Sequence, residues 1–226
     1  MIPPEGRAFE LLRRPMWDYE PCAAWQRRRA AAIAAGGAGQ ALLLTEHPPV
    51  YTVGRRATPE EIVGVRFGEM TLPVVPTDRG GRTTYHGPGQ SMVYVLRDLR
   101  PHPMAVREHV HRLEGLAIAV LAGLGLRGER LPGLPGVWVE GEKIAALGVR
   151  VSRGVAYHGL SLNRDPELAH YAGILPCGLT GRRVTSLAAL GVSLSRAELE
   201  ARLAAAFVPL FGATVEGEES SWDEEG

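Results

Sequence analysis

Apolar residues recur at helical spacing in two parts of the chain. Between Met104 and Leu124 they stand three or four positions apart, which predicts an amphipathic helix with this stripe toward the core: Val106, Val110, Leu113, Ala117, Val120 and Leu124. Near the other end, Ser195 and Glu198 have the spacing of a capping box, so a helix is predicted to start at Ser195 and to bury Leu199, Leu203, Ala206 and Leu210. A third helix is predicted over Tyr19–Ala35, which is rich in alanine and arginine and is ended by Gly36-Gly37.

Shorter apolar runs predict strands. Ala41–Thr45 and Val50–Val53 flank the segment Glu46-His47-Pro48-Pro49, and Ser91–Leu96 has the composition of a buried strand. Three further runs form a predicted meander with turns at Glu140-Gly141 and Ser152-Arg153-Gly154: Val137–Val139, Lys143–Val151 and Val155–Leu162. The stretch from Pro73 to Gln90 is rich in glycine, proline and threonine and is expected to be a long loop with short extended pieces.

The order of these elements predicts the fold class. Strands fall in clusters with helices between them, and hairpins are present, which favours an α+β (α/β) fold with a mixed or antiparallel β-sheet flanked by helices. No linker or repeat divides the chain, so one domain over residues 1–215 is expected. Residues 216–226 carry six acids and no base and are expected to form a disordered tail.

Composition narrows the class of partner. Lys+Arg and Asp+Glu are both 25, so the formal net charge is zero, and a general attraction to nucleic acid or to an anionic membrane is not expected. No apolar run is long enough to span a membrane, and Met1–Arg14 lacks the order of a signal peptide. The two cysteines, Cys22 and Cys177, form neither a disulfide framework nor a CxxC metal site. We therefore expect a cytoplasmic protein, and a monomer.

The chain contains a single lysine, Lys143, while the other 24 of its 25 basic residues are arginine. Drift in the coding DNA explains an excess of arginine, but it does not explain why one position is still lysine. Lysine can give up its proton in a protein, whereas arginine in practice cannot. Lys143 is therefore a candidate acid–base residue. Its neighbours, Glu142 and Ile144, exclude a phosphate-binding loop of the GxxxxGK[ST] type.

Two further features could carry chemistry. Residues 78–90 combine paired glycines with threonine, tyrosine and histidine, which predicts a ligand-binding loop. Cys177 lies between Pro176 and Gly178, where a turn can expose the thiol and aim the next N–H at an oxyanion. An ordinary thiol is mostly protonated at pH 7, so a nucleophilic Cys177 needs an activator, and three side chains could serve: Lys143, His86 and His158.

The remaining cysteine and histidines are given structural roles. Cys22 lies in an alanine-rich helix and is expected in the core. His102, His109, His111 and His170 are expected on exposed or partly exposed faces, and no tight spacing of ligands supports a metal site.

Five motifs in order resemble those of the lipoyl(octanoyl) transferases, the protein-lipoylation enzymes within the biotin/lipoate protein ligase fold. They are Glu46-His47-Pro48-Pro49-Val50-Tyr51-Thr52-Val53-Gly54-Arg55, Arg79-Gly80-Gly81-Arg82-Thr83-Thr84-Tyr85-His86-Gly87-Pro88-Gly89-Gln90, Gly141-Glu142-Lys143-Ile144-Ala145-Ala146-Leu147-Gly148, His158-Gly159-Leu160-Ser161-Leu162-Asn163 and Pro176-Cys177-Gly178. The similarity runs from about Tyr19 to Leu187.

This resemblance implies an acyltransferase with a catalytic pair, Cys177 and Lys143. It implies a substrate pocket made of three segments: Arg79, Gly80, Gly81, Arg82, Thr83, Thr84, Tyr85 and His86; Ala146, Leu147 and Gly148; Gly159, Leu160 and Ser161. It implies no cofactor, metal or nucleotide. The implied donor is octanoyl-acyl carrier protein, and the implied acceptors are the lipoyl domains of 2-oxoacid dehydrogenases and the glycine cleavage H protein.

Three other functions fit parts of the same pattern. An ATP-dependent lipoate–protein ligase has the same fold, a glycine-rich loop and a lysine, but it would not need Cys177. A non-catalytic carrier domain could present Lys143 as an acyl acceptor after its hairpin turn. A cysteine hydrolase could use Cys177 with a histidine and would release free acid.

Overall fold

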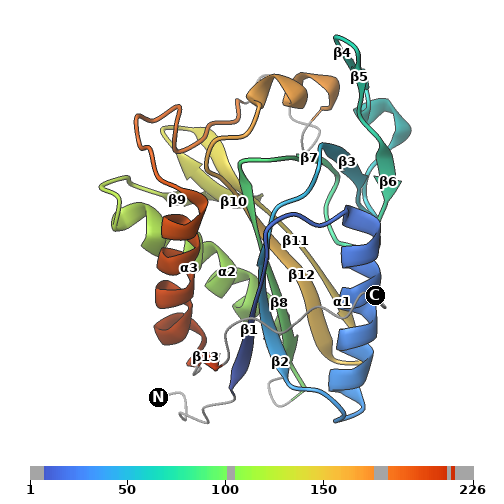
Figure 1. Ribbon diagram of the computed structural model, residues 1–226, viewed down its shortest axis with the longest axis vertical. Helices are drawn as coiled ribbons and strands as arrows, with labels where there is room; N and C mark the ends of the chain where they lie inside the picture. Colours follow the sequence, from blue (N-terminus) through green and yellow to red (C-terminus); the bar gives the residue numbers. More distant parts are fainter. Residues whose placement is uncertain (1–7, 101–104, 176–182, 213–214, 217–226) are drawn as a thin grey trace.

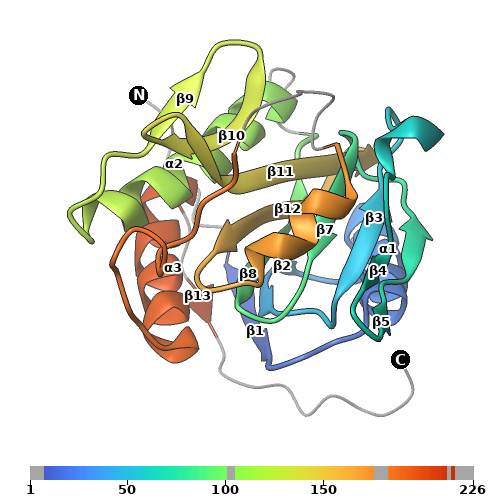
Figure 2. The same cartoon turned by 90° about the horizontal axis from the view of Figure 1, so that it is seen from above.

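The computed structural model describes residues 8–100, 105–175, 183–212 and 215–216. An eight-stranded sheet runs through the molecule, with helices on both faces (Figures 1 and 2). In sheet order its strands are β13 (Val215–Glu216), β1 (Phe9–Arg14), β2 (Gln40–Thr45), β8 (Gln90–Asp98), β12 (Val155–Asn163), β11 (Glu142–Ser152), β10 (Leu134–Val139) and β9 (Glu129–Leu131).

The sheet is mixed, as expected. Strand β1 pairs in parallel with both β13 and β2, and every other neighbouring pair is antiparallel. The predicted meander is confirmed as β10, β11 and β12, and its turns at Glu140-Gly141 and Arg153-Gly154 place both residues of each turn at positive φ. Such turns match the twist of the strands that they join.

Each face of the sheet has its own helices and core. Helix α1 (Tyr19–Ala34) covers one face, where Leu12, Leu43 and Leu96 meet its buried side chains. Helices α2 (Ala105–Ala122) and α3 (Arg196–Phe211) cover the other face around a larger core (Figure 1). The three predicted helices are confirmed within a few residues of their expected ends.

The ends of α3 agree with the predicted capping chemistry. The Ser195 hydroxyl accepts a hydrogen bond from the Glu198 N–H at 3.2 Å, and the Glu198 carboxylate accepts one from the Ser195 N–H at 2.8 Å. Gly212 ends the helix in the left-handed conformation. Leu199 and Leu203 are buried as expected, and Phe207 and Phe211 continue the stripe, while Ala206 and Leu210 lie at its edge.

The buried stripe of α2 differs from the prediction. Val106 is 47% exposed, whereas His109 is fully buried beside Phe211. The expectation that His109 lies on an exposed or partly exposed face is therefore wrong. The reason is that Leu113, Leu116 and Val120 face the core, and His109 stands four residues before Leu113 on that same stripe. His111 is exposed and His170 is half-buried, while His102 lies outside the described residues.

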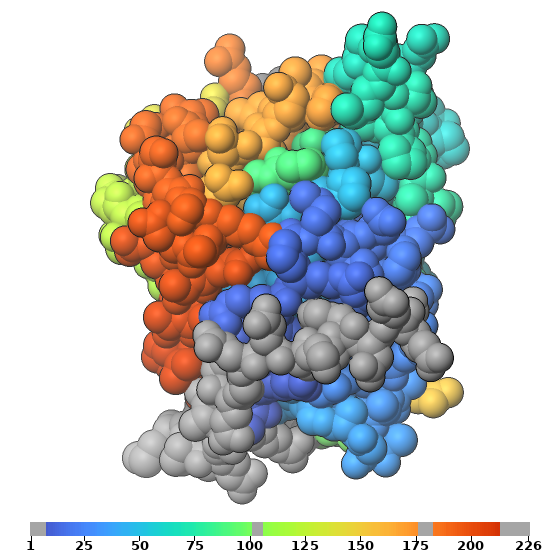
Figure 3. All heavy atoms as spheres, viewed as in Figure 1, coloured from blue at the N-terminus to red at the C-terminus, as the bar shows by residue number. Residues whose placement is uncertain are grey.

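The stretch predicted as a loop contributes to a second sheet. Strands β3 (Val50–Val53), β6 (Val74–Pro76) and β7 (Thr83–His86) form it in the order β6-β3-β7. A small hairpin, β4 (Arg66–Phe67) and β5 (Met70–Thr71), projects beyond this sheet (turquoise in Figures 1 and 3). Two 3₁₀ helices complete the described elements, η1 (Pro59–Glu61) and η2 (Leu168–Gly173).

Two expectations concern the ends of the described chain. Glu216, the first residue of the expected tail, pairs with Glu10 at the edge of the large sheet, and 217–226 lie outside the described residues. No helix among the described residues is long and apolar enough to cross a membrane.

Candidate active site

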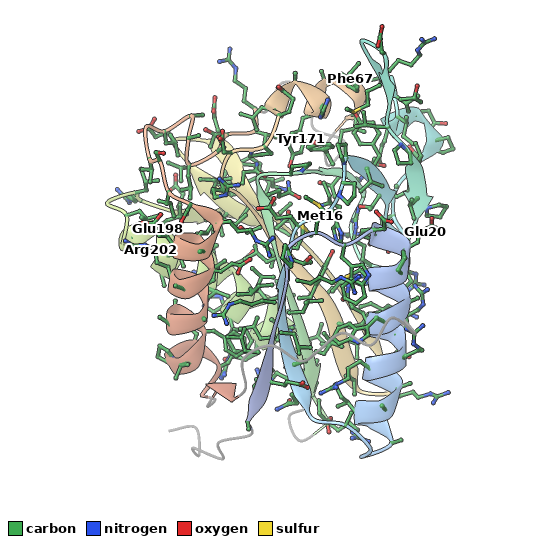
Figure 4. All side chains as sticks on the ribbon, viewed as in Figure 1. Met16, Glu20, Phe67, Tyr171, Glu198 and Arg202 are labelled. Atoms are coloured by element: carbon green, nitrogen blue, oxygen red, sulfur yellow. The ribbon has the colours of Figure 1, made fainter. Side chains whose placement is uncertain are left out.

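A cavity of about 400 Å³ lies between residues of the small sheet with its loop and the β11–β12 part of the large sheet. Tyr171 of η2, labelled in Figure 4, is among the residues that line it and receives a hydrogen bond from the Gln90 amide at 2.8 Å. We take this cavity as the candidate active site because residues of three motifs that are far apart in the sequence line it together.

All but one of the expected pocket residues line this cavity. The lining includes the whole of 79–84 with His86, as well as Ala146, Leu147 and Gly148 on β11 and Gly159, Leu160 and Ser161 on β12. Tyr85 does not line it. Successive residues of a strand face opposite sides, so between Thr84 and His86 the Tyr85 side chain packs instead with Tyr51, Leu72 and Ile174.

The backbone at these segments is in close contact because of glycine. A Cβ at Gly148 would lie 2.8 Å from the Gly80 oxygen and 3.0 Å from Arg79 Cδ, and a Cβ at Gly54 would lie 2.5 Å from the Gly81 oxygen. The Gly80 N–H donates to the Val149 oxygen at 2.9 Å. Glycine at 148 therefore lets the loop lie directly on β11, and glycine at 54 lets it lie against the end of β3.

The buried side chain of Arg79 connects the glycine-rich loop to strand β3. It is 7% exposed, and its guanidinium donates to the Thr52 hydroxyl and to the Thr52 carbonyl, each at 2.7 Å from Nη2, and to the Gly80 carbonyl at 3.2 Å. A planar group with several donors is suited to hold strand β3 and the loop in one register. Arg79 thus has a structural task at the cavity wall.

Lys143 lines the same cavity and is 8% exposed. Its N–H donates to the Arg183 carbonyl at 3.0 Å, and its carbonyl accepts from the Thr185 N–H at 2.9 Å, so the backbone at Lys143 bridges to 183–185. Its Nζ lies 5.0 Å from the centre of the Trp138 ring. The structure thus places the sole lysine at the cavity wall.

Cys177 lies in 176–182, outside the described residues, so its place relative to Lys143 stays a prediction. In the sequence it stands six positions before Arg183, the residue bonded to the Lys143 backbone. Cys22 is fully buried, as expected for a core residue. Burial raises the pKa of the Cys22 thiol to about 12, which keeps it protonated and unreactive.

The two histidines considered as activators also line the cavity, in neutral form. His86 Nδ1 donates to the Gln90 side-chain oxygen at 2.6 Å, and the ring stacks on Tyr19. Burial holds the pKa of His86 well below its ordinary value. His158 Nε2 lies 2.8 Å from Asp78 Oδ1. Burial lowers the pKa of His158, whereas the hydrogen bond from His158 lowers the pKa of Asp78, so a neutral imidazole donates to a carboxylate.

Further buried polar groups contact residues that line the cavity. His47 bonds to the Trp17 carbonyl at 2.5 Å and to the Tyr94 hydroxyl at 2.7 Å, and burial lowers the pKa of His47 to about 4. His158 has φ +61°, a strained conformation that its backbone N–H bond to Gln26 at 2.9 Å helps to hold. Among the described residues, no three His, Cys, Asp or Glu side chains are placed to hold a metal ion.

Several lining residues were not expected from the sequence. Tyr19 begins a helix predicted from its alanine and arginine content, Tyr94 lies in a strand predicted from its apolar run, and Leu134 and Pro135 belong to β10 before the predicted Val137–Val139. Behind the cavity wall, the buried Gln26 gave a usable signal, since a polar residue in an alanine-rich helix needs a hydrogen-bond partner, here the His158 N–H.

Comparison with known proteins identifies the class of protein to which this fold belongs. Residues 18–208 match the model of a protein family described as "Lipoyl protein ligase A/B catalytic domain". A lipoate-protein ligase A bound with ATP has a similar fold, with a TM-score of 0.77 at 17% identity over 95% of this chain and 90% of that one. The fold is therefore that of the lipoate-protein ligases.

Closer relatives define the group within that class. The octanoyltransferase of Magnetococcus marinus (strain ATCC BAA-1437 / JCM 17883 / MC-1) is 50% identical over 92% of this chain and 96% of its own. That of Chelativorans sp. (strain BNC1) is 45% identical over 86% and 83%. The chain belongs to the lipoyl protein ligase A/B catalytic family and, within it, to the octanoyltransferases. The expected acyltransferase activity is thereby confirmed.

Proposed function

We propose that this enzyme transfers an octanoyl group from acyl carrier protein, through a thioester on Cys177, to a lysine of a lipoyl domain in lipoate biosynthesis. The observation that carries the proposal is the position of Lys143. The only lysine of the chain is buried at the wall of a cavity that the expected acyl-pocket segments also line. A cytoplasmic location is part of the proposal, because that compartment keeps a reactive thiol reduced.

In the first step the Cys177 thiolate attacks the thioester carbonyl of the donor. The carbon–sulfur bond to the carrier breaks, the acyl group stays on Cys177, and the leaving carrier thiolate takes a proton from Lys143. One thioester replaces another, so the energy change is small. Backbone N–H groups near Cys177 would stabilise the tetrahedral oxyanion, and one such donor is typically worth about 3 kcal/mol.

In the second step a neutral lysine amine of the acceptor attacks the Cys177 thioester. An amide forms, the bond from carbon to Cys177 breaks, and Lys143 takes the proton that the amine loses. Cys177 and Lys143 return to their starting forms. An amide is more stable than a thioester, so the second step runs downhill and the proposed cycle balances without a nucleotide.

The cavity supports recognition of an apolar chain. Met92, Leu147 and Leu160 contribute apolar side chains to its lining. At about 0.8 kcal/mol per methylene, burial of an octanoyl tail would contribute roughly 5 kcal/mol. The neutral histidines support Lys143 as the proton carrier, since burial disfavours the imidazolium form that His86 or His158 would have to reach.

The nature of the acceptor is supported by a related system. A bipartite lipoate protein ligase from Thermoplasma acidophilum, studied with its E2 lipoyl domain, shares the fold with a TM-score of 0.69. The lipoyl domains of 2-oxoacid dehydrogenases and the glycine cleavage H protein are the proposed acceptors for this chain.

The test is a transfer reaction without nucleotide. Purified enzyme is mixed with octanoyl-acyl carrier protein and a lipoyl domain, and the mass of the lipoyl domain is followed. We expect one octanoyl group on the domain without ATP. Transfer only from free octanoate with ATP would indicate the ligase reaction, and release of free octanoate without modification of the domain would indicate a hydrolase.

A further inference from the structure

Lys143 and Trp138 form a directly opposed pair on neighbouring strands. The register between β10 and β11 shifts after Val137, so that Val137 stands opposite Ala145 while Trp138 stands opposite Lys143. This bulge puts the ammonium group over the indole, with Nζ 5.0 Å from the ring centre. Trp138 is 1% exposed, so the contact is largely shielded from water. That distance lies within the range of a cation–π interaction.

Gly136 leaves the room in which the lysine side chain lies. Its φ is +129°, and a Cβ at this position would lie 2.8 Å from Lys143 Cε, 3.3 Å from Nζ and 2.6 Å from the Ala145 oxygen. The Gly136 N–H donates to Glu114 Oε1 on α2 at 3.2 Å. Gly136, held to α2 by this bond, and the Trp138 ring thus border the Lys143 side chain.

Among the residues that the structure describes, charged side chains near this pair come from several elements. Glu114 on α2 faces Gly136, and Arg130 on β9 donates to Glu114 Oε2 at 2.9 Å. Glu142 precedes Lys143 on β11, and Arg183 bonds to its backbone. Strand β10 itself carries no charged residue, and on β12 the neighbouring Asn163 is neutral. A change at Trp138 leaves all of these charges in place.

We propose that Trp138 is a positioning residue that holds Lys143 as an ammonium at the cavity wall, in the space that Gly136 leaves. This inference rests on the proposed function of Lys143 as proton carrier. An ammonium is the form that can protonate the leaving carrier thiolate in the first step. The negative face of the indole stabilises that form and not the neutral amine.

The single lysine makes a direct test possible without substrate. Protein labelled with [¹³C]lysine has one ε-CH₂ resonance, whose shift follows protonation of Lys143. We expect Trp138→Leu to lower the midpoint of this titration by about one pH unit, from the size of a shielded cation–π contact. Trp138→Phe retains an aromatic face, so its midpoint should lie close to that of the wild type. Trp25→Leu, at a half-buried tryptophan of α1 whose ring packs at a tilt beside Trp17, should leave the midpoint unchanged.

A midpoint in folded Trp138→Leu equal to that of the wild type would overturn the inference. If Trp138→Leu does not fold, fluorinated tryptophans provide the same test at nearly constant volume, because each added fluorine weakens the negative face of the ring. We then expect the midpoint to fall stepwise with fluorine number, and a constant midpoint would overturn the inference. Both measurements follow Lys143 in the enzyme without an acyl donor, so failure of the proposed thioester would be seen separately.

Discussion

Lys143 occupies a space whose limits are set by single residues. Gly136 bounds it on one side, the Trp138 ring on another, and the bridge to Val184 fixes the backbone. The guanidinium of arginine is wider than an ammonium and cannot serve as a base at neutral pH. The difference between lysine and arginine at this position is therefore both steric and chemical.

We expect Lys143→Arg to reduce octanoyl transfer at least about 100-fold, the lower end for a positioned acid–base group. The measurement is kcat for transfer to a lipoyl domain, with Arg153→Lys on an exposed turn as a control for a basic exchange elsewhere. A rate near that of the wild type would mean that Lys143 acts only as a positive charge. The single lysine of the chain would then be an accident of composition.

Helix α2 is predicted correctly as a helix, but the face that it buries differs from the predicted one. The spacing of its apolar residues fits more than one stripe, and the choice between them depends on α3 and the sheet. Because Phe211 and Phe207 pack against the core here, His109 is buried and Val106 faces outward. Among the described residues, neither nitrogen of the His109 ring has a hydrogen-bond partner.

This burial predicts a pH dependence of stability. Burial, with Arg97 and Arg112 nearby, lowers the pKa of His109 to about 3. In the unfolded chain histidine titrates near pH 6.5, so between these values the unfolded state binds the extra proton and stability falls as pH falls. We expect the free energy of unfolding to lose about 2 kcal/mol from this group between pH 7 and pH 5.

The measurement is urea unfolding at both pH values. His109→Leu should reduce the measured loss by about 2 kcal/mol, while His111→Leu, at an exposed position of the same helix, should leave it unchanged. An equal dependence on pH in the wild type and in His109→Leu would show that other groups are responsible.

Other elements differ in how far the sequence could predict them. Tyr19–Ala34, Arg196–Phe211 and the meander have local signals, namely caps, glycine turns and strand alternation. Strand β1 has none, because Phe9–Arg14 ends in two arginines and its apolar residues find their partners, Phe207 among them, at the far end of the chain. In the small sheet, β3 is predicted from its apolar run at Val50–Val53, whereas β6 and β7 are expected only as short extended pieces of a loop, because they are short and contain proline or threonine.

At the scale of the whole molecule, the site is an assembly of remote segments. The motifs identified the residues of 79–86, 146–148 and 159–161, but their convergence depends on the order of strands in two sheets. Pairing of Gly148 with Gly159, and contact of Gly148 with the 79–81 loop, bring the three segments together. Trp138 and Gly136 could not be found from spacing, because a register shift between strands creates their contact with Lys143.

The central claim is that acyl transfer passes through Cys177, and intact-mass measurement tests it most directly. After mixing with octanoyl-acyl carrier protein, without acceptor or nucleotide, we predict one octanoyl group on the enzyme that hydroxylamine removes. Cys22→Ala, a change at the buried cysteine, should still form this adduct, and Cys177→Ala should not. A labile octanoyl adduct that persists in Cys177→Ala would contradict the account.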